Sequence, residues 1–271
     1  MNVSPRWDAI IEDWRATAPW DEPEHVVQDL VLSRLIVEIA NDKRLRRRLV
    51  LHGGTCLHKI WHNTPLRYSE DLDFLCTKPR HLPFVMRRVK QIMRHAGLSD
   101  ARYSFWGYPS IAASEVDGRA VDLKVDFNPT LEAARRAFRN RSSRGSLTVD
   151  TDWYRGQTTL IPCASPTDIL ASKIAAIMTR AKPRDLADLC TGFAAGLSDV
   201  DSAVAAYHEH YRRPSHPTTL KSRVDLLLAD ETYRAGLAGG TDYQPTPLTD
   251  DSVLAAAAQI DNSIAKRRSA T

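Results

Sequence analysis

The stretch that decides the fold is LHGGTCLHKIWHNTPLRYSEDLDFLC, which runs from Leu51 to Cys76. The apolar run 48–52 leads into Gly53-Gly54-Thr55, and a second short apolar run carries Asp71-Leu72-Asp73. The residues between them, 55–61, have the composition of a short helix. The stretch therefore predicts the order strand, Gly-Gly turn, helix, strand.

The two aspartates are placed so that they can act together. Side chains alternate faces along a strand, so Asp71 and Asp73 share one face while Leu72 and Phe74 share the other. Neighbouring carboxylates repel each other unless a cation lies between them, and Mg²⁺ takes carboxylate and phosphate oxygens together. A solvated strand face would also show an isolated Asp-x-Asp, so this motif alone leaves both interpretations open.

The glycines narrow the choice. A strand that ends in Gly-Gly-Thr ahead of a helix lets backbone amides approach a phosphate closely. Such a pair is often a plain turn, but Gly-Gly-Thr followed by a short helix and Asp-x-Asp is a much narrower pattern. The combination predicts a triphosphate cradle beside a metal site.

A third strand could supply another carboxylate. The run VDLKVDF, residues 121–127, alternates apolar and polar positions, so Asp122, Lys124 and Asp126 share a face. Asp126 is the favoured third acid because it lies nearer the strand end, and Asp122 remains the alternative.

A lysine interrupts an apolar stripe further along the chain. The segment Ser165 to Ile177 begins with a good helix cap and a proline, and Lys173 sits among its apolar positions. Lysine is rarely buried without a partner, so Lys173 either extends to solvent or faces a cleft between lobes that holds an anion. Asp185 and Asp188 follow in the first turn of the next helix, where carboxylates suit the helix dipole.

The length and composition predict two lobes. The 271 residues are 43% hydrophobic, which is enough for two cores. Residues 1–160 alternate helical and strand patterns, whereas residues 161–271 are helical with breaks at prolines and glycines. We expect an α+β fold with a mixed sheet, followed by a helical carboxyl-terminal lobe. The further elements expected in the first lobe are helices at 23–40 and 81–95, and strands at 103–113 and 121–127 that flank a turn at Asp117-Gly118.

The charge pattern permits a polyanionic partner without requiring one. The net charge is +4, and arginines cluster at 44–48 and 134–144 as either phosphate contacts or solvated faces. The segment 132–145 is expected to begin as a helix or basic loop and to end as a mobile connection.

The cysteine spacing, the amino-terminal sequence and the lengths of the apolar runs predict a cytoplasmic protein. The four cysteines are far apart in sequence, and the amino terminus lacks a secretory pattern, which favours a cytoplasmic protein with reduced thiols. No apolar run approaches the roughly 20 residues of a membrane span, so we expect no membrane role.

Taken together, the motifs resemble those of a known family. HGGTCLHK, RYSEDLDF, VDLKVDF, PTDILASKIAAI and RAKPRDLADL are similar, in content and order, to the AbiEii/AbiGii type IV toxin nucleotidyltransferases, which include the MenT-like toxins. The resemblance covers residues 51–189, about half of the chain. It implies a polymerase-β-like nucleotidyltransferase core and a helical second lobe.

The resemblance also implies an activity and a set of partners. These are transfer of a nucleoside monophosphate from an NTP with Mg²⁺, a tRNA 3′ end as acceptor, a block of translation, and a cognate antitoxin. The residues that match the family motifs are Gly53, Gly54, Thr55 and Ser69 for the nucleotide, Asp71 and Asp73 for Mg²⁺, Asp126 as third acid, and Lys173 and Asp185 as the late essential pair. Lys173 is expected to bind the triphosphate.

Two alternatives stay open at this point. One keeps the enzyme but changes the acceptor to a hydroxyl of a protein or small molecule. The other is a non-catalytic binding module that uses the fold as a scaffold.

Overall fold

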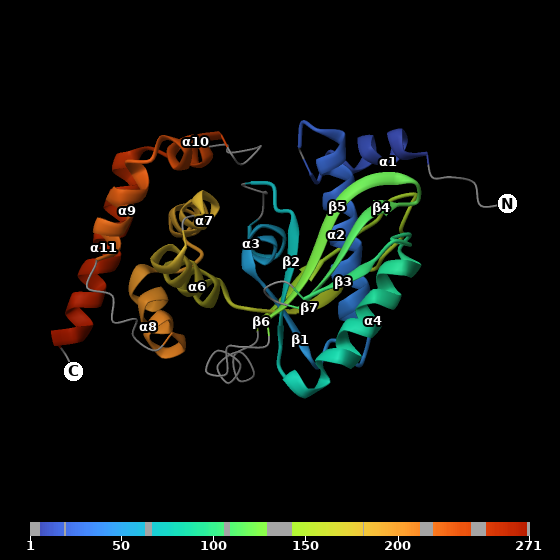
Figure 1. Ribbon diagram of the computed structural model, residues 1–271, viewed down its shortest axis with the longest axis horizontal. Coiled ribbons are helices and arrows are strands. Elements are labelled where there is room, and N and C mark those ends of the chain that lie inside the picture. Colours follow the sequence, from blue (N-terminus) through green and yellow to red (C-terminus); the bar gives the residue numbers. More distant parts are fainter. Residues whose placement is uncertain are drawn as a thin grey trace. The chain divides into compact units, whose positions relative to one another are not determined.

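The computed structural model divides the chain into two compact units, Met1–Ala164 and Ser165–Thr271 (Figure 1). It describes residues 6–18, 20–62, 67–105, 109–128, 143–180, 182–211, 219–239 and 248–269. The division falls after Ala164, where the sequence pattern suggested residue 160, because the last strand of the first unit continues to Cys163.

The first unit is built on a seven-stranded mixed sheet in the order β3-β4-β5-β2-β1-β7-β6. Its central strands pair as β1 with β2 antiparallel, β2 with β5 parallel and β1 with β7 parallel. The strands are β1 (Leu49–His52), β2 (Asp71–Cys76), β3 (Arg102–Ser104), β4 (Ser110–Val116), β5 (Arg119–Asn128), β6 (Ser143–Leu147) and β7 (Thr159–Cys163). The mixed sheet expected from the sequence is confirmed.

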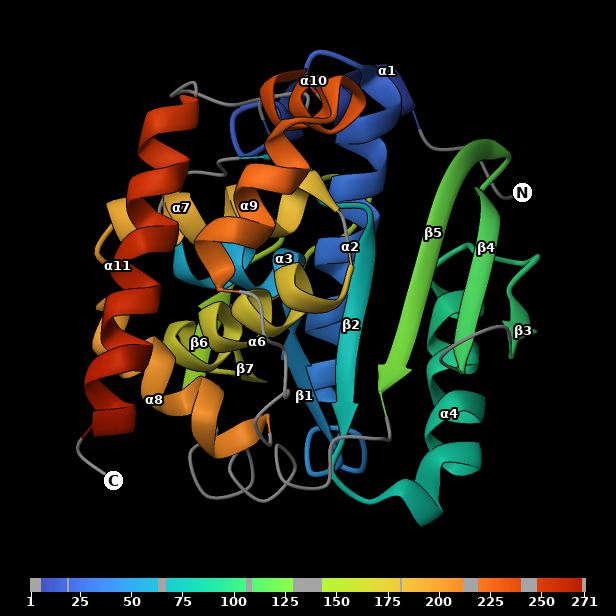
Figure 2. The same cartoon turned by 60° about the vertical axis from the view of Figure 1, so that its left-hand side comes forward.

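Helices cover this sheet. They are α1 (Trp7–Trp14), α2 (Pro23–Asn41), α3 (Gly53–Cys56) with a π-helical turn at Leu57–Trp61, a 3₁₀ turn at Pro79–His81, and α4 (Leu82–His95). α2 packs against β5 and β7, α4 packs against β4, and the two helices contact each other. Both lie behind the sheet in the view of Figure 2.

Several local predictions for this unit are confirmed. The helices expected at 23–40 and 81–95 correspond to α2 and α4. The turn expected at Asp117-Gly118 joins β4 to β5, with both residues at positive φ, 45° and 83°. Two successive positive-φ residues define the type I′ turn that suits the twist of a two-residue hairpin.

Two predictions for this unit are wrong in detail. The single strand expected at 103–113 is divided into β3 and β4, which pair antiparallel. Ser143 to Gly145, expected to end a mobile connection, begin edge strand β6, which pairs with β7. A side chain at Gly145 would collide with Ile60, so the glycine lets β6 approach the π-helical turn. The remainder of the 132–145 segment lies outside the described residues.

The second unit contains only helices in its described residues, in agreement with the sequence pattern. They are α6 (Pro166–Thr179), α7 (Pro183–Ala194), α8 (Val200–His210), α9 (Leu220–Leu228), α10 (Glu231–Gly239) and α11 (Asp250–Ser269). Ser165, Asp199 and Thr219 cap α6, α8 and α9 with their side chains. The break expected at Lys182-Pro183 marks the start of α7, whereas those at 214–217 and 245–247 lie outside the described residues.

A membrane-spanning helix is not found in the described part of the chain. None of its helices combines the length and the apolar character that a bilayer requires.

Candidate active site

The Gly-Gly turn and the paired aspartates meet in the first unit. Gly53 follows directly on β1 and has a φ of +77°, a conformation that favours glycine. A Cβ at this position would collide with the carboxylate of Asp73, whose residue pairs with His52 across the β1–β2 ladder. The turn therefore packs directly on one of the two predicted metal-binding side chains.

The carboxylates of β2 share the face expected from the alternation. Asp71 and Asp73 are half-buried, whereas Leu72 and Phe74 are buried on the other face. In the parallel register with β5, Asp73 lies opposite Asp126, and Asp71 lies opposite Lys124. Two strands thus bring three carboxylates and one ammonium group to the same face of the sheet.

The register also separates Asp126 from Asp122. The ammonium of Lys124 lies 2.8 Å from Oδ1 and 2.9 Å from Oδ2 of Asp126, whose side chain is 15% exposed. Asp122 is exposed and lies before the first residue of β5 that pairs with β2. The pairing favours Asp126 as the acid that accompanies Asp73.

Thr55 and Ser69 connect the turn to the start of β2. The Thr55 side chain is fully buried, its Oγ lies 2.8 Å from Ser69 Oγ, and its hydroxyl donates to the carbonyl of Asp71. Gly54 is buried beside it in α3. These contacts fix the position of the turn relative to the aspartates.

The donor set around the turn fits magnesium. Mg²⁺ commonly takes one or two protein carboxylates and completes its shell with substrate phosphates and water. Asp71 and Asp73 supply two such oxygen donors on one face, beside the Gly53-Gly54 turn. Within the described residues, no group of three or more histidine, cysteine, aspartate or glutamate side chains is arranged as a complete metal cage. A site that relies on substrate oxygens does not need one.

Lys173 lies in the second unit, in a buried ion-pair network. Its ammonium lies 2.9 Å from Asp185 Oδ1 and 2.6 Å from Asp188 Oδ2, and its side chain is 7% exposed. Arg180 adds a second cation, with its Nε 2.6 Å from Asp185 Oδ2. The interpretation that Lys173 extends to solvent is wrong, because the carboxylates of α7 bind it inside the helical unit.

The charges of this network alter the titration of Asp185. Burial alone would raise the pKa of its carboxyl group, but the ammonium of Lys173 and the guanidinium of Arg180 outweigh burial and lower it. Burial, and after it the negative charge of Asp185, raises the pKa of Tyr233 to about 12. Asp185 is therefore ionised, and Tyr233 is neutral, at physiological pH.

The first unit also contains a buried charged residue, Asp29, that the sequence reasoning missed. Asp29 of α2 accepts hydrogen bonds from the indoles of Trp14 (2.9 Å) and Trp20 (3.2 Å), and the Lys59 ammonium lies 2.6 Å from it. A small cavity of about 110 Å³ is lined by this cluster and by Ser69. The signal was present, because Asp29 interrupts an apolar helix in the same way as Lys173.

A second missed pair lies in the helical unit. His210 Nε2 is 2.8 Å from Asp168 Oδ1, and both side chains are buried. Ser165 donates to the other oxygen of Asp168 at 2.6 Å. The spacing of 42 residues between Asp168 and His210 carried no sequence signal.

A glycine turn packed against paired aspartates, on a mixed sheet followed by a helical unit, is the arrangement that the sequence motifs predicted for a nucleotidyltransferase. The comparisons with known proteins give the family. The model of the nucleotidyl transferase AbiEii toxin family, of type IV toxin–antitoxin systems, matches residues 34–258, far more than half of the chain. The chain belongs to this family, and the resemblance read from the sequence motifs is confirmed.

Solved structures agree with the fold. MenT4, a nucleotidyltransferase toxin from Mycobacterium tuberculosis H37Rv, is 19% identical, with 94% of this chain and 88% of that chain covered and a TM-score of 0.58. JHP933 from Helicobacter pylori is also 19% identical, with 92% and 97% covered and a TM-score of 0.56. A search of curated proteins gave no match. At these identities the likeness establishes a shared fold.

Proposed function

We propose that this nucleotidyltransferase transfers a nucleoside monophosphate from an NTP to the 3′ hydroxyl of a tRNA, with Mg²⁺, and so blocks translation. The observation that carries the proposal is the Gly53 turn packed on the Asp73 carboxylate, with Asp126 opposite. Phosphoryl transfer needs positioning and charge neutralisation more than covalent chemistry from the protein.

Each residue of the first unit has a role in this proposal. The backbone amides of Gly53 and Gly54 donate to the triphosphate, and Thr55 with Ser69 holds the turn in place. Asp71 and Asp73 would hold Mg²⁺, which when bound neutralises phosphate charge. Asp126 accepts the proton of the attacking hydroxyl, whose oxygen bonds to the α-phosphorus while the bond between the α- and β-phosphates breaks and pyrophosphate leaves.

For Lys173 and Asp185 we propose a positioning role. The family resemblance assigns Lys173 to the triphosphate, but two carboxylates already occupy its ammonium group in a buried setting. Direct contact with a phosphate would require one of these carboxylates to leave. We therefore assign the pair to holding α6 and α7 together, and we expect its loss to destabilise the helical unit.

The test is transfer of label from α-³²P-NTPs to total tRNA, followed by mass spectrometry of tRNA 3′ ends. Asp71→Asn, Asp73→Asn and Asp126→Asn are expected to lower labelling at least 100-fold, because each removes a charge from the reacting face. Asp122→Asn is the matched control, since it makes the same chemical change at an exposed position on β5, the strand that carries Asp126. Equal labelling by all four variants would refute the site.

The acceptor is tested in the same reactions. Label in RNA supports the proposal, whereas label in protein or in a small hydroxyl compound moves the activity to another acceptor.

We also propose a cognate antitoxin, as expected for a toxin–antitoxin family. If it exists, growth arrest caused by the protein should be relieved when an adjacent open reading frame is co-expressed. The Asp71→Asn variant, which is expected to lack transfer, should cause no growth arrest.

A further inference from the structure

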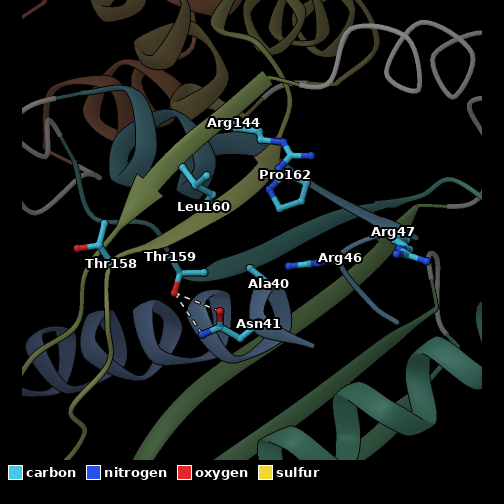
Figure 3. Close-up of a pocket in the computed structure, with 9 residues that line it drawn as sticks. All are labelled: Ala40, Asn41, Arg46, Arg47, Arg144, Thr158, Thr159, Leu160 and Pro162. Atoms are coloured by element: carbon cyan, nitrogen blue, oxygen red, sulfur yellow. Dashed lines mark hydrogen bonds between the residues drawn. The ribbon is translucent and has the colours of Figure 1, made fainter. Parts of the chain in front are cut away.

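A second cavity in the first unit has the character of an anion site. Its volume is about 440 Å³, within the range of small-molecule sites. Figure 3 shows that its lining comes from the end of α2, the segment ahead of β1, and strands β6 and β7. Arg46 and Arg47 precede β1, whereas Gly53 follows it. The cavity therefore opens at the other end of that strand from the predicted catalytic turn.

The cavity carries an unbalanced positive charge. Arg46, Arg47 and Arg144 line it, and no aspartate or glutamate is among its lining residues. The nearby carboxylate of Asp42 pairs with Arg88, whose Nε lies 2.7 Å away, and accepts a hydrogen bond from the backbone amide of Leu45. In the described ranges, none of the three lining arginines has an ion pair with a carboxylate. Guanidinium groups in this state favour phosphate, which they can bind with two parallel hydrogen bonds.

The rest of the lining suits the remainder of a nucleotide. Asn41 and Thr159 present an amide and a hydroxyl that bond to each other at 3.2 Å, as Figure 3 shows. Leu160 is 60% exposed and lies in the same lining as Pro162, which gives an apolar wall beside the arginines. A phosphate with an attached sugar and base is complementary to this lining, because it presents negative charge, hydroxyl groups and apolar faces.

We propose that this cavity binds a phosphorylated nucleoside unit at a site separate from the catalytic turn. Arg46, Arg47 and Arg144 hold the phosphate, while Leu160 and Pro162 contact the sugar or base. The unit is supplied either by an RNA strand or by a free nucleotide, and the chemistry of the cavity is the same for both. The proposal does not depend on the transfer reaction, since it concerns binding alone.

The test is binding without Mg²⁺ or NTP, with the full chain carrying Asp71→Asn so that no transfer occurs. The probes are a fluorescein-labelled single-stranded 12-nucleotide RNA, followed by anisotropy, and AMP and inorganic phosphate, followed by calorimetry. The pocket variant is Arg46→Gln/Arg47→Gln/Arg144→Gln. The charge-matched control is Arg87→Gln/Arg94→Gln/Arg102→Gln, three exposed arginines of the same unit outside the cavity lining.

We expect the pocket variant to weaken RNA or AMP binding at least tenfold, and the control to weaken it by less than threefold. For RNA, the slope of log K against log salt should fall by about 0.7, since the three arginines hold one phosphate and each lost phosphate contact on a single strand contributes about 0.7. Loss with RNA alone identifies a polynucleotide as the ligand, and loss with AMP as well identifies a nucleotide site.

Equal effects of the pocket and control variants, or no effect of either, would overturn the proposal. Circular dichroism and tryptophan fluorescence establish that each variant folds, and the single change Arg144→Gln on edge strand β6 repeats the test with the least perturbation. Because the readout is binding, failure here leaves the transferase assay unaffected.

Discussion

Replacing Lys173 by methionine tests the assignment of this residue most directly. Its ammonium attracts two carboxylates at 2.9 and 2.6 Å, and at an effective dielectric constant of about 20 each attraction is roughly 6 kcal/mol. The loss of hydration of three charged groups offsets most of this gain. The substitution removes the attraction but leaves Asp185 and Asp188 buried, so we expect a loss of about 3–5 kcal/mol in the free energy of unfolding.

The chain offers a convenient way to locate this loss. All six tryptophans precede residue 165, so tryptophan fluorescence reports on the first unit only, whereas circular dichroism at 222 nm also follows the helices of the second. In urea unfolding of the full chain, Lys173→Met should lower the midpoint of the helical signal. The matched control is Lys221→Met, whose side chain is 49% exposed and pairs with Asp225 one helical turn away, and we expect a cost of about 0.5 kcal/mol or less.

The pH dependence and a compensated variant sharpen the test. In Lys173→Met both carboxylates lose the ammonium group, and Arg180 remains paired with Asp185, so protonation of the buried carboxylates relieves the remaining repulsion and the loss should be smaller at pH 5 than at pH 8. Neutralising the whole cluster with Lys173→Met/Asp185→Asn/Asp188→Asn should restore much of the stability, since no buried charge remains. A loss below about 1 kcal/mol, together with abolished transfer, would refute the positioning role and favour direct contact with the triphosphate.

Three further predictions follow from the same structure. Gly53→Ala should reduce transfer at least tenfold, because the new methyl group meets Asp73 in a backbone conformation that costs about 1–2 kcal/mol for alanine; wild-type transfer would contradict this. The pKa of Asp185 is lower in the folded state than its unfolded value of about 3.9, so the ionised carboxylate contributes stability above about pH 3.9 that is lost as the pH falls through the folded pKa. Unfolding followed by circular dichroism between pH 6 and pH 3 should therefore show a smaller loss of stability in Asp185→Asn than in the wild type. All four cysteines are buried, and burial raises the pKa of Cys190 to about 12, so a thiol reagent should react with the native protein at least tenfold more slowly than with protein in urea; four fast thiols in the native state would disprove it.

The sequence predicts the local geometry of β1, the glycine turn and β2 well because that geometry depends on local rules. Alternation along a strand places Asp71 and Asp73 on one face, and a positive-φ turn requires the glycine at 53. Which of Asp122 and Asp126 lies opposite Asp73 depends on the register of β5 against β2, which is a property of the assembled sheet. Strand β6 was missed for the same reason, since its pairing with β7 overrides a sequence of low strand propensity.

The sequence reveals that a charged residue is buried, but it does not reveal which residue pairs with it. A charged residue on an apolar helix, such as Lys173 or Asp29, is visible as an anomaly, and an anomaly of this kind requires a partner. The partner itself is selected by packing between helices. Asp185 and Asp188 are three residues apart and share a face of α7, so their joint approach to one lysine follows from helical periodicity once α6 and α7 are known to pack together.

The parallel pairing of β2 with β5 has a consequence for the order in which the protein becomes active. Asp73 and Asp126 are neighbours in the sheet, yet the chain must build α4, β3 and β4 between them. Contacts so distant in sequence form late during folding, because the entropy of closing the intervening loop must be overcome first. A nascent or partly folded chain therefore carries the glycine turn and its aspartates without their acidic neighbour. Under the proposed function, such a chain lacks the residue that we assign to accept the proton of the attacking hydroxyl, so transfer is expected only once the sheet is complete.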